Sequence, residues 1–450
     1  MVLVRRLAGL GLVLVAVLGA IEREPLESYR QRRASLAARH ADGVVVLFGY
    51  SEKEGQFTRS PFRQENNFYY LSGWNEPGAV LCLLGEGKAG PYREFLFLPE
   101  RNPSREAWTG RRLGPADANA PAATGFDEVL PRAKLAEVVS GALQGRPRLY
   151  SPYPRDTPGY EQPPEPDRDA QLEQLAPGYP KADIRESLES LRRVKSASEI
   201  RLIRRATEAS IAAHRAAWMK IAPGVHEYQV AATMLSVMMD QGCLRAAYTP
   251  IIGSGLNTTV LHYSQATRRM GPGELVVMDV GGEYGHYAAD ITRTVPVDGR
   301  FTPRQREIYE IVLAAQRAAL DAIGPGMTLG GHGEKSLTEI VRAYFDSHGS
   351  DQDGQPLGRY FTHGLGHHVG LEVHDPGDSG IPLEPGMVVT VEPGLYLPQE
   401  EIGVRIEDLV LITEDGAEVL SQGLPKDPAE IEQLMNAAPA EPRASAGGGR

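Results

Sequence analysis

The feature that most constrains this chain is a set of carboxylates that interrupt apolar, strand-forming runs. LVVMDV contains Asp279, VVTVEP contains Glu392 and VRIEDLVLIT contains Glu407, and Asp290 follows Asp279 by eleven residues. A buried carboxylate is costly unless it is paired or bound to a metal. Four such acids within one part of a 450-residue chain therefore predict strands whose carboxylates converge on a common site.

Residues 273–297, GELVVMDVGGEYGHYAADITRTVPV, predict a β-hairpin that carries the first two acids. LVVMDV has the composition of a strand, and Gly281-Gly282 is expected to start the reversal. Successive side chains of a strand point to opposite faces, so Asp290 and the threonines at every second position after it are expected to share one face. This places Asp290 on the strand next to Asp279.

The other two acids are predicted in two further strands. Glu392 is expected at the end of a β-branched run within residues 386–398. Glu407 is expected in the middle of a strand over residues 401–413, with Arg405 two residues earlier on the same face.

Histidines gather in the stretch FTHGLGHHVGLEVHD, residues 361–375, which holds four of the eleven in the chain: His363, His367, His368 and His374. The first two are four apart, as in a helical zinc site. Three glycines interrupt the stretch, however, and each costs about 1 kcal/mol in a helix interior. The stretch is therefore predicted to be a loop or a bent strand, whose histidines need partners from elsewhere in the chain.

Charge balance predicts a binuclear metal site. Converging carboxylates raise one another's pKa values unless cations neutralise them, and two divalent ions balance four carboxylates. One imidazole among four carboxylates is a hard, oxygen-rich donor set that favours manganese, with cobalt, iron and zinc as alternatives. Two such ions activate water and polarise a carbonyl group, which predicts a hydrolase.

Composition excludes some classes of protein. The net charge of −11 argues against nucleic-acid binding, which depends on basic patches. Cys82 and Cys243 are too few for a disulfide scaffold, and each is expected to be a small buried hydrophobe. The 49 glycines and 34 prolines amount to about 18% of the chain, against about 12% in an average protein, which favours strands and tight turns.

The N-terminus predicts export. MVLVRR precedes an apolar run over residues 7–21, which is short for a membrane span and typical of a signal peptide. Residues 1–22 are therefore predicted to be a signal peptide of a periplasmic or secreted protein. An uncleaved membrane anchor, or a cytoplasmic protein whose start is misassigned, remains as the alternative.

The rest of the chain predicts two domains. Residues 24–170 alternate short helices with buried strands at 43–50, 79–84 and 93–100. A proline-rich stretch from Ser151 and helices around 169–175 and 183–193 lead into a linker region at 171–195.

A capping box, Ser196 to Glu199, opens a helix and a second domain over residues 196–425. Further helices are expected around 226–240 and at 303–322 and 333–347, with strands between and after them. Residues 426–450 are predicted to be a disordered tail. The fold class is α+β, with an N-terminal α/β domain before the larger one.

The sequence resembles the pita-bread metallopeptidases, which include aminopeptidase P, prolidase and methionine aminopeptidase. The phrases MDVGG, ADITRT, HGLGHHVGLEVHD, LEPGMVVTVEPGLY and VRIEDLVLIT carry the resemblance. PFRQENNFYYLSGWNEPGAVLCLL, residues 61–84, resembles the amino-terminal domain that aminopeptidase P and prolidase share. The resemblance implies a pita-bread catalytic domain with these five metal ligands: Asp279, Asp290, His367, Glu392 and Glu407.

The resemblance also implies roles around the ligands. His363 and His374 correspond to cleft histidines that contact the substrate and help to move protons. His262, in VLHYS, corresponds to a histidine that assists the tetrahedral intermediate. Glu392, a ligand able to hold a proton, is the candidate general base and acid. His368 is expected to be structural.

Substrate recognition follows from the same resemblance. AWTGRRLG, residues 107–114, resembles an aminopeptidase P segment whose tryptophan, here Trp108, lines the substrate cleft. Tyr396 and Arg405 are expected to contact the substrate or to support the ligands. The implied activity releases the N-terminal residue from peptides with proline in second position, and the relatives' dimers and tetramers imply a homo-oligomer.

Three alternatives are weighed against the aminopeptidase. Prolidase, which accepts only Xaa-Pro dipeptides, is the nearest, but the Trp108 segment and the phrase NNFYYLSGWNEP favour the aminopeptidase. The loop PGDSGIPLEPGM lacks a basic residue that some relatives carry, which bears on the length of substrate accepted. A creatinase-like hydrolase works without metals, and a non-catalytic peptide-binding module needs none. Both are expected to have lost several of the five ligands, all of which are present here.

Overall fold

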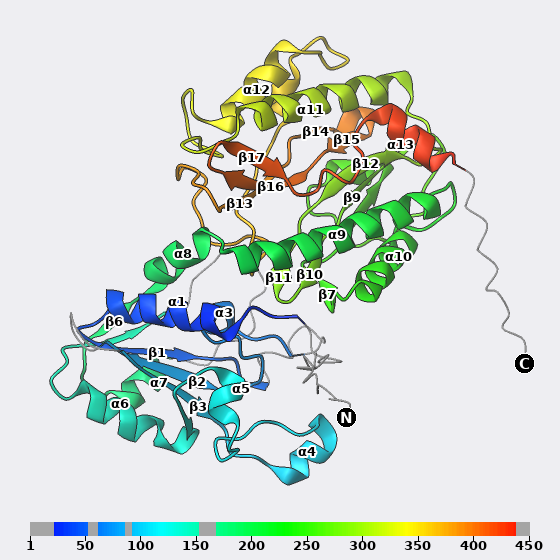
Figure 1. The fold of residues 1–450 in the computed structure, drawn as a ribbon. Coiled ribbons are helices and arrows are strands. Elements are labelled where there is room, and N and C mark those ends of the chain that lie inside the picture. Colours follow the sequence, from blue (N-terminus) through cyan, green and yellow to red (C-terminus); the bar gives the residue numbers. More distant parts are fainter. Residues whose placement is uncertain (1–21, 53–61, 86–91, 153–167, 438–450) are drawn as a thin grey trace, which may run out of the picture.

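The N-terminal half of the chain forms a six-stranded mixed sheet (Figure 1). The computed structural model describes residues 22–52, 62–85, 92–152 and 168–437. The strand order is β4-β3-β2-β1-β5-β6. The strands are β1 (Val44–Phe48), β2 (Val80–Leu84), β3 (Arg93–Leu98), β4 (Glu128–Pro131), β5 (Leu149–Ser151) and β6 (Lys181–Asp183). The first three lie within the ranges predicted from their apolar runs.

Helices lie on both sides of this sheet, with α1 and α3 on one side and α6 and α7 on the other (Figure 1). The helices are α1 (Leu26–Arg39), α3 (Asn66–Ser72), α4 (Pro103–Thr109), α5 (Ala120–Thr124), α6 (Leu135–Leu143), α7 (Arg168–Leu175) and α8 (Arg185–Arg193). The range 171–195, predicted to be a linker, therefore contains secondary structure of the N-terminal half. Strand β6 within it pairs in parallel with β5 and forms an edge of the sheet.

The C-terminal half begins at α9, where the predicted capping box forms. The Ser196 hydroxyl accepts from the Glu199 N–H, and the Glu199 carboxylate accepts from the Ser196 N–H. The helices of this half are α9 (Ala197–Lys220), α10 (Glu227–Asp240), α11 (Pro303–Ala322), α12 (Leu337–Ser347) and α13 (Pro428–Met435). They flank the strands, with α9 and α10 on one side and α11 and α12 on the other (Figure 1).

The strands of the C-terminal half form small antiparallel sheets. They are β7 (Arg245–Ala246), β8 (Ile251–Ser254), β9 (Leu275–Asp279), β10 (Gly282–Tyr284), β11 (Tyr287–Ala288), β12 (Thr292–Pro296), β13 (Val388–Val391), β14 (Gly394–Leu397), β15 (Ile402–Arg405), β16 (Asp408–Thr413) and β17 (Gly416–Val419). Short 3-10 turns, η3 (Gly255–Thr259), η4 (Leu357–Tyr360) and η5 (Pro398–Glu400), connect them.

Two predictions for this half need correction. The hairpin of residues 273–297 does not reverse directly at Gly281-Gly282: β9 and β12 pair antiparallel, but β10 and β11 form a smaller hairpin between them. The tail predicted to be disordered from residue 426 contains α13. The Asp427 carboxylate caps this helix, and Ile431 buries its side chain in the core. Residues 438–450 and residues 1–21, which include most of the predicted signal peptide, lie outside the described residues.

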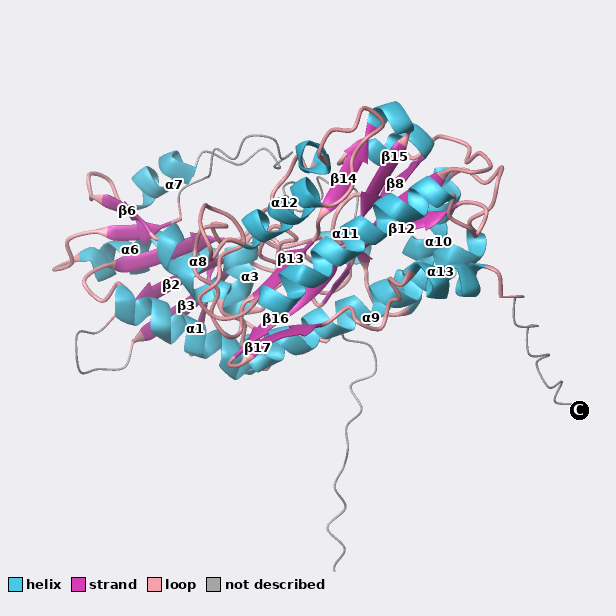
Figure 2. Cartoon of the chain, turned by 90° about the horizontal axis from the view of Figure 1, so that it is seen from above, coloured by secondary structure: helices cyan, strands magenta, loops and turns pink. Residues whose placement is uncertain are grey.

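One apolar cluster joins the two halves. It combines residues of the first sheet and its helices, such as Leu36 and Phe68, with Leu202 of α9, Tyr287 of β11 and Val388 of β13. Figure 2 shows the two halves from above, with the first sheet at one end and the strands of the second half at the other. No helix among the described residues is long and apolar enough to cross a membrane.

Candidate metal centre

Two aspartates enter the site from neighbouring strands. Asp279 ends β9, and Asp290 lies just before β12, so the β9–β12 pairing brings them together. The Tyr248 hydroxyl, in the turn before β8, donates toward Oδ1 of Asp279 at 2.6 Å and toward Oδ1 of Asp290. One phenol therefore fixes the separation of both carboxylates.

His367 approaches these aspartates from the glycine-punctuated loop. Its Nε2 lies 3.4 Å from Oδ2 of Asp290 and 3.5 Å from Oε1 of Glu392. The loop follows β13 closely, because a Cβ on Gly366 would lie 2.1 Å from the Thr390 carbonyl oxygen. The Nδ1 of His367 faces the His368 carbonyl oxygen at 3.1 Å, which directs Nε2 toward the acids.

The two glutamates follow strand ends. Glu392 comes directly after β13 and accepts a hydrogen bond from the Thr390 hydroxyl at 3.1 Å. Glu407 was predicted in the middle of a strand but lies at the break between β15 and β16. At that break its N–H bonds to the Thr292 carbonyl oxygen at 3.1 Å, and its carboxylate accepts from the Thr292 hydroxyl at 2.7 Å.

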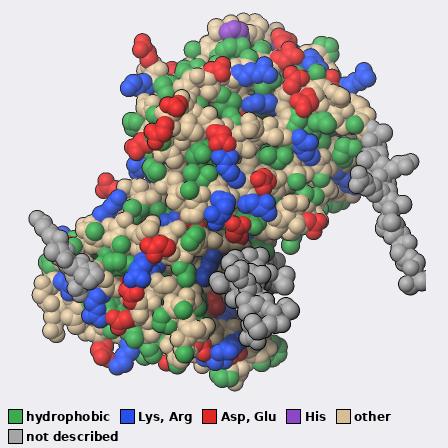
Figure 3. All heavy atoms as spheres, in the orientation of Figure 1, with side chains coloured by type: hydrophobic (Ala, Val, Ile, Leu, Met, Phe, Trp, Pro, Cys, Tyr) green, Lys and Arg blue, Asp and Glu red, His purple; other side chains and the backbone are tan. Residues whose placement is uncertain are grey.

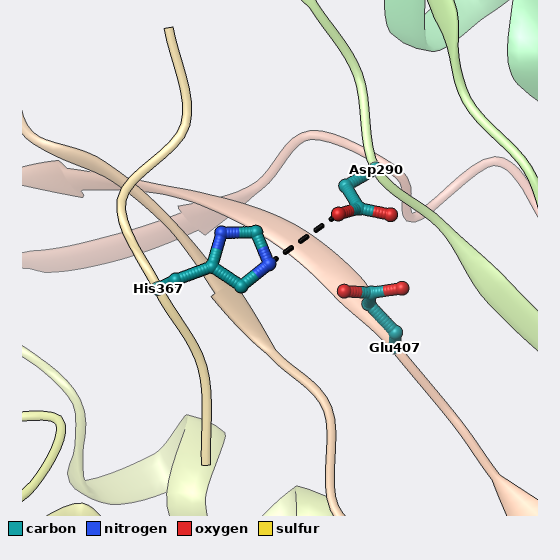
Figure 4. Close-up of side chains that lie close together, drawn as sticks. All are labelled: Asp290, His367 and Glu407. Carbon is teal, nitrogen blue, oxygen red and sulfur yellow. Dashed lines mark ion pairs between the residues drawn. The ribbon is translucent and has the colours of Figure 1, made fainter. Parts of the chain in front are cut away.

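Asp290, His367 and Glu407 each offer a ligand atom within 4.8 Å of the others (Figure 4). The imidazole and both carboxylates point toward a common centre, from three different segments. Asp279 and Glu392 extend this group through Tyr248 and through His367. The donor set is one imidazole and four carboxylates; Asp279, Asp290 and Glu407 are buried and His367 and Glu392 are half-buried. Such a set fits divalent metal ions.

Electrostatics support the same conclusion. Burial and the neighbouring acids raise the pKa of Glu407 well above its ordinary range. Burial also raises the pKa of Glu392 to about 7, and the charge of Asp290 adds to this effect. Burial would lower the pKa of His367, but its hydrogen bond to Asp290 and the charge of Glu392 raise it to about 9. The site therefore concentrates negative charge that cations would neutralise.

A hydrogen-bonded row of side chains borders the acids. Arg405 donates to Oδ2 of Asp279 at 2.7 Å and to the Tyr396 hydroxyl at 3.0 Å. The same hydroxyl lies 2.9 Å from Nε2 of His363. Burial and the charge of Arg405 lower the pKa of His363 to about 4. Neutral His363 is thus connected to the carboxylates through two intermediate side chains.

Of the remaining predicted residues, His374 and His262 lie near the acids and Trp108 does not. The His374 ring lies 4.1 Å from the His367 ring, and desolvation within the site together with the charge of His367 lowers its pKa to about 4, although the residue remains accessible to solvent. His262, after η3, is exposed and lies in the neighbourhood of His363 and His374. Trp108 lies on α4 of the first half, where 90% of its surface is exposed, and the structure does not bring it to the acids.

The sequence prediction missed three supporting residues: Tyr248, Thr292 and Thr390. Each orients a carboxylate through a hydroxyl group, and none is charged. The only signal was positional, because Thr292 lies two residues after Asp290 and Thr390 two residues before Glu392. Tyr248 is more than 30 residues from either aspartate, so nothing in the sequence linked it to them.

Comparisons with known proteins place the chain in a family. The profile of Metallopeptidase family M24 matches residues 201–414, and that of Aminopeptidase P, N-terminal domain, matches residues 29–150. The Xaa-Pro aminopeptidase of Haemophilus influenzae is 35% identical over 440 residues, covering 92% of this chain and 98% of that protein. The Xaa-Pro aminopeptidase of Escherichia coli is 35% identical over 438 residues, with the same coverage of both chains.

Solved structures agree with this placement. Proline aminopeptidase P II from Yersinia pestis superposes with a TM-score of 0.80 at 36% identity, covering 92% of this chain and 99% of that chain. Aminopeptidase P from Escherichia coli with the inhibitor Pro-Leu superposes with a TM-score of 0.79 at 34% identity and the same coverage. The similarity extends over both halves of the chain.

Proposed function

The chain belongs to metallopeptidase family M24, and from this membership we propose how its site performs the reaction and with which metal ions. Its activity is that of a metal-dependent Xaa-Pro aminopeptidase, because relatives of that name match nearly their whole length. The prolidase alternative is not favoured. The observation that carries this function is the convergence of Asp290, His367 and Glu407 within a group of buried acids.

We propose that the site holds two Mn²⁺ ions. The five residues that would hold them are Asp279, Asp290, His367, Glu392 and Glu407. The hard, oxygen-rich donor set supports manganese, although cobalt, iron and zinc can occupy similar sites. The bound ions would supply Lewis-acid polarisation of the scissile carbonyl and a lowered pKa of water.

Glu392 is suited to move the proton of this reaction. Its carboxyl group can both accept and release a proton, which is what general acid–base catalysis requires. It would accept the proton released when water adds to the carbonyl and deliver it to the departing nitrogen. The Thr390 hydroxyl, 3.1 Å away, holds the carboxyl group in place for both transfers.

His363, His374 and His262 would act on the substrate. The His363 and His374 rings both have a pKa lowered to about 4 and are neutral near pH 7, so each can donate or accept a hydrogen bond. The Arg405–Tyr396 pair fixes the orientation of His363. We assign His363 and His374 to the peptide on either side of the scissile bond, and exposed His262 to the developing oxyanion.

The assembly and cellular location are part of the same proposal. We infer a homo-oligomer, a dimer or tetramer, and the 90% exposure of Trp108 supports this because exposed tryptophans are enriched at interfaces. Light scattering after size exclusion, with Trp108→Ala as the variant, tests it.

We also infer export through the signal peptide, on the apolar run of residues 7–21. Fractionation of expressing cells, followed by N-terminal sequencing, tests this location.

The activity is tested on protein that lacks the leader, stripped of metal and resupplied with Mn²⁺. We expect a Xaa-Pro-Pro tripeptide to be cleaved faster than a Xaa-Pro dipeptide. Asp279→Asn should lower kcat/KM by at least about a hundredfold, since even supporting residues of metal sites contribute about 10- to 100-fold. Cleavage of the dipeptide alone would identify a prolidase, and no cleavage of either peptide with metal bound would refute the proline specificity.

A further inference from the structure

The loop between His367 and His374 returns to its starting point. The Asp375 N–H donates to the His368 carbonyl oxygen at 2.8 Å and closes the loop. His374 precedes this closure by one residue, and its ring lies 4.1 Å from the ring of His367. The position of the His374 imidazole therefore depends on how firmly Asp375 is held.

Asp375 is held by two cations of the connection between the halves. Its Oδ1 accepts from Arg192 at 2.6 Å, and its Oδ2 accepts from Lys195 at 3.0 Å. All three residues are buried, with 5%, 2% and 4% of their surfaces exposed. Burial alone would raise the pKa of Asp375, but the charges of Arg192 and Lys195 lower it below its ordinary range. The carboxylate therefore stays ionised and bonded at neutral pH.

The N-terminal half makes further contacts with the same loop and with Arg192. Arg192 also donates to the Asn67 side chain of α3 at 2.8 Å. Arg63, in the segment before α3, donates to the Leu371 carbonyl oxygen at 2.7 Å. Arg192 further bonds to the Glu372 carboxylate at 3.0 Å. The loop that ends at His374 is thus fixed by contacts that originate outside the catalytic half.

Two glycines leave the loop little room for another arrangement. A Cβ on Gly370 would lie 2.4 Å from Oδ2 of Asp375, and one on Gly377 would lie 2.1 Å from the His368 ring. Both distances are far below van der Waals contact. The carboxylate of Asp375 and the ring of His368 therefore fill the space inside and beside the loop, and a shift of Asp375 is transmitted to the backbone.

We propose that Arg192 and Lys195 are positioning residues of the peptidase: acting through Asp375, they hold the loop of residues 368–375 so that His374 stays beside the metal-ligand group. This inference rests on the proposed function, because His374 is assigned there to the substrate. The connection between the halves is thereby part of the cleft's geometry. A displacement of about 1 Å at a catalytic group can cost about a hundredfold in rate, so small changes in this support affect turnover.

The test combines Arg192→Met and Lys195→Met with His374→Ala. Each single variant should lower kcat/KM on the tripeptide by about 10- to 100-fold, as supporting residues of such sites do. In the His374→Ala background the same substitutions should lower kcat/KM by less than about threefold, because the imidazole that they position is absent. Lys195→Met keeps the Arg192–Asp375 bond and is the milder change if Arg192→Met folds poorly.

Hydrogen exchange gives a readout that needs no substrate. Amides of residues 369–375 should exchange faster in both variants, notably Glu372, whose N–H bonds to Oδ1 of Asp375. Arg204→Met is the matched control, since Arg204 pairs with Glu418 at the surface of α9 and should change neither readout.

The inference would be overturned if the substitutions lowered kcat/KM equally with and without His374. Unchanged hydrogen exchange of the amides of residues 369–375 would also overturn it. An inactive wild-type protein whose loop exchange still depends on Arg192 and Lys195 would count against the proposed function alone. The loop support itself would then stand.

Discussion

At the residue scale, His214 provides a clear pH dependence. It lies buried on α9, with Nε2 3.2 Å from the carbonyl oxygens of both Val280 and Ile291, the residues that follow Asp279 and Asp290. Burial lowers its pKa to about 3, whereas an unfolded histidine has a pKa of about 6.5. Between these values the unfolded chain binds a proton that the folded chain does not, so stability falls as the pH falls.

We therefore expect the free energy of unfolding to fall as the pH is lowered from 6 to 4, and to fall more steeply in wild type than in His214→Gln. The difference between the two slopes should be about 1.4 kcal/mol per pH unit. Urea titrations of both proteins, with metal chelated, measure this difference, in which the other titrating groups cancel. Parallel pH profiles would mean that His214 is protonated in the folded protein.

Tyr248 gives a second prediction at this scale. Tyr248→Phe removes the hydroxyl that contacts Asp279 and Asp290, and should weaken metal affinity or activity by about 10- to 100-fold. Titration of the stripped protein with Mn²⁺ measures the affinity. Tyr263→Phe is the control, because its hydroxyl bonds to Glu227, which belongs to a different cluster. Equal affinity in both variants would contradict the role of Tyr248.

The sequence located charged residues better than neutral ones. An acid in an apolar strand is conspicuous because its burial needs compensation, and this argument found Asp279 and Glu392 from local sequence alone. No similar rule singles out a tyrosine or threonine, since both are common in strands. Tyr248 was linked to the aspartates only by the fold, and Thr292, expected on the face of Asp290, showed its bond to Glu407 only there.

At the element scale, α13 shows where composition misleads. Its sequence lies next to a low-complexity tail, yet Ile431 is buried against the core of the second half. Ile431→Ala should lower the free energy of unfolding by about 2 to 4 kcal/mol, as other buried Ile→Ala changes do. Gln433→Ala, on the exposed side of the same helix, should change it by less than about 0.5 kcal/mol. Denaturant titration compares the two, and similar effects would mean that α13 is not packed.

Helices were predicted more accurately than strand breaks. The capping box fixed the start of α9, and α11 spans the range that its sequence predicted. The run of residues 401–413 reads as one strand, because its apolar pattern continues through Glu407. It breaks there because β15 pairs with β14 whereas β16 pairs with β13 and β17, a choice of partners that no local pattern contains.

At the scale of the whole molecule, the halves are joined by charge as well as by apolar packing. Arg32 of α1 pairs with Glu24 at 2.6 Å and with Glu199 of α9 at 3.0 Å, and the Tyr287 hydroxyl bonds to both acids. On the outer surface, acidic and basic side chains are interspersed over the face shown in Figure 3. The Arg32–Glu199 pair between the halves, by contrast, is buried.

This junction predicts cooperative unfolding. Trp74 reports on the first half and Trp218, on α9, on the second. Variants that keep only one of these tryptophans, the others being replaced by Phe, should lose fluorescence at the same urea concentration, which should also match loss of helical circular dichroism. Two separate midpoints would show that the halves unfold independently.

The apolar cluster shared by the two halves also bears on turnover of the protein in a cell. Proteases act on the population of opened molecules, and opening here exposes both halves together. A chain that has lost its first half also lacks the Arg63 contact to the loop that ends at His374. Under the cooperative unfolding predicted above, the peptidase is degraded as one unit.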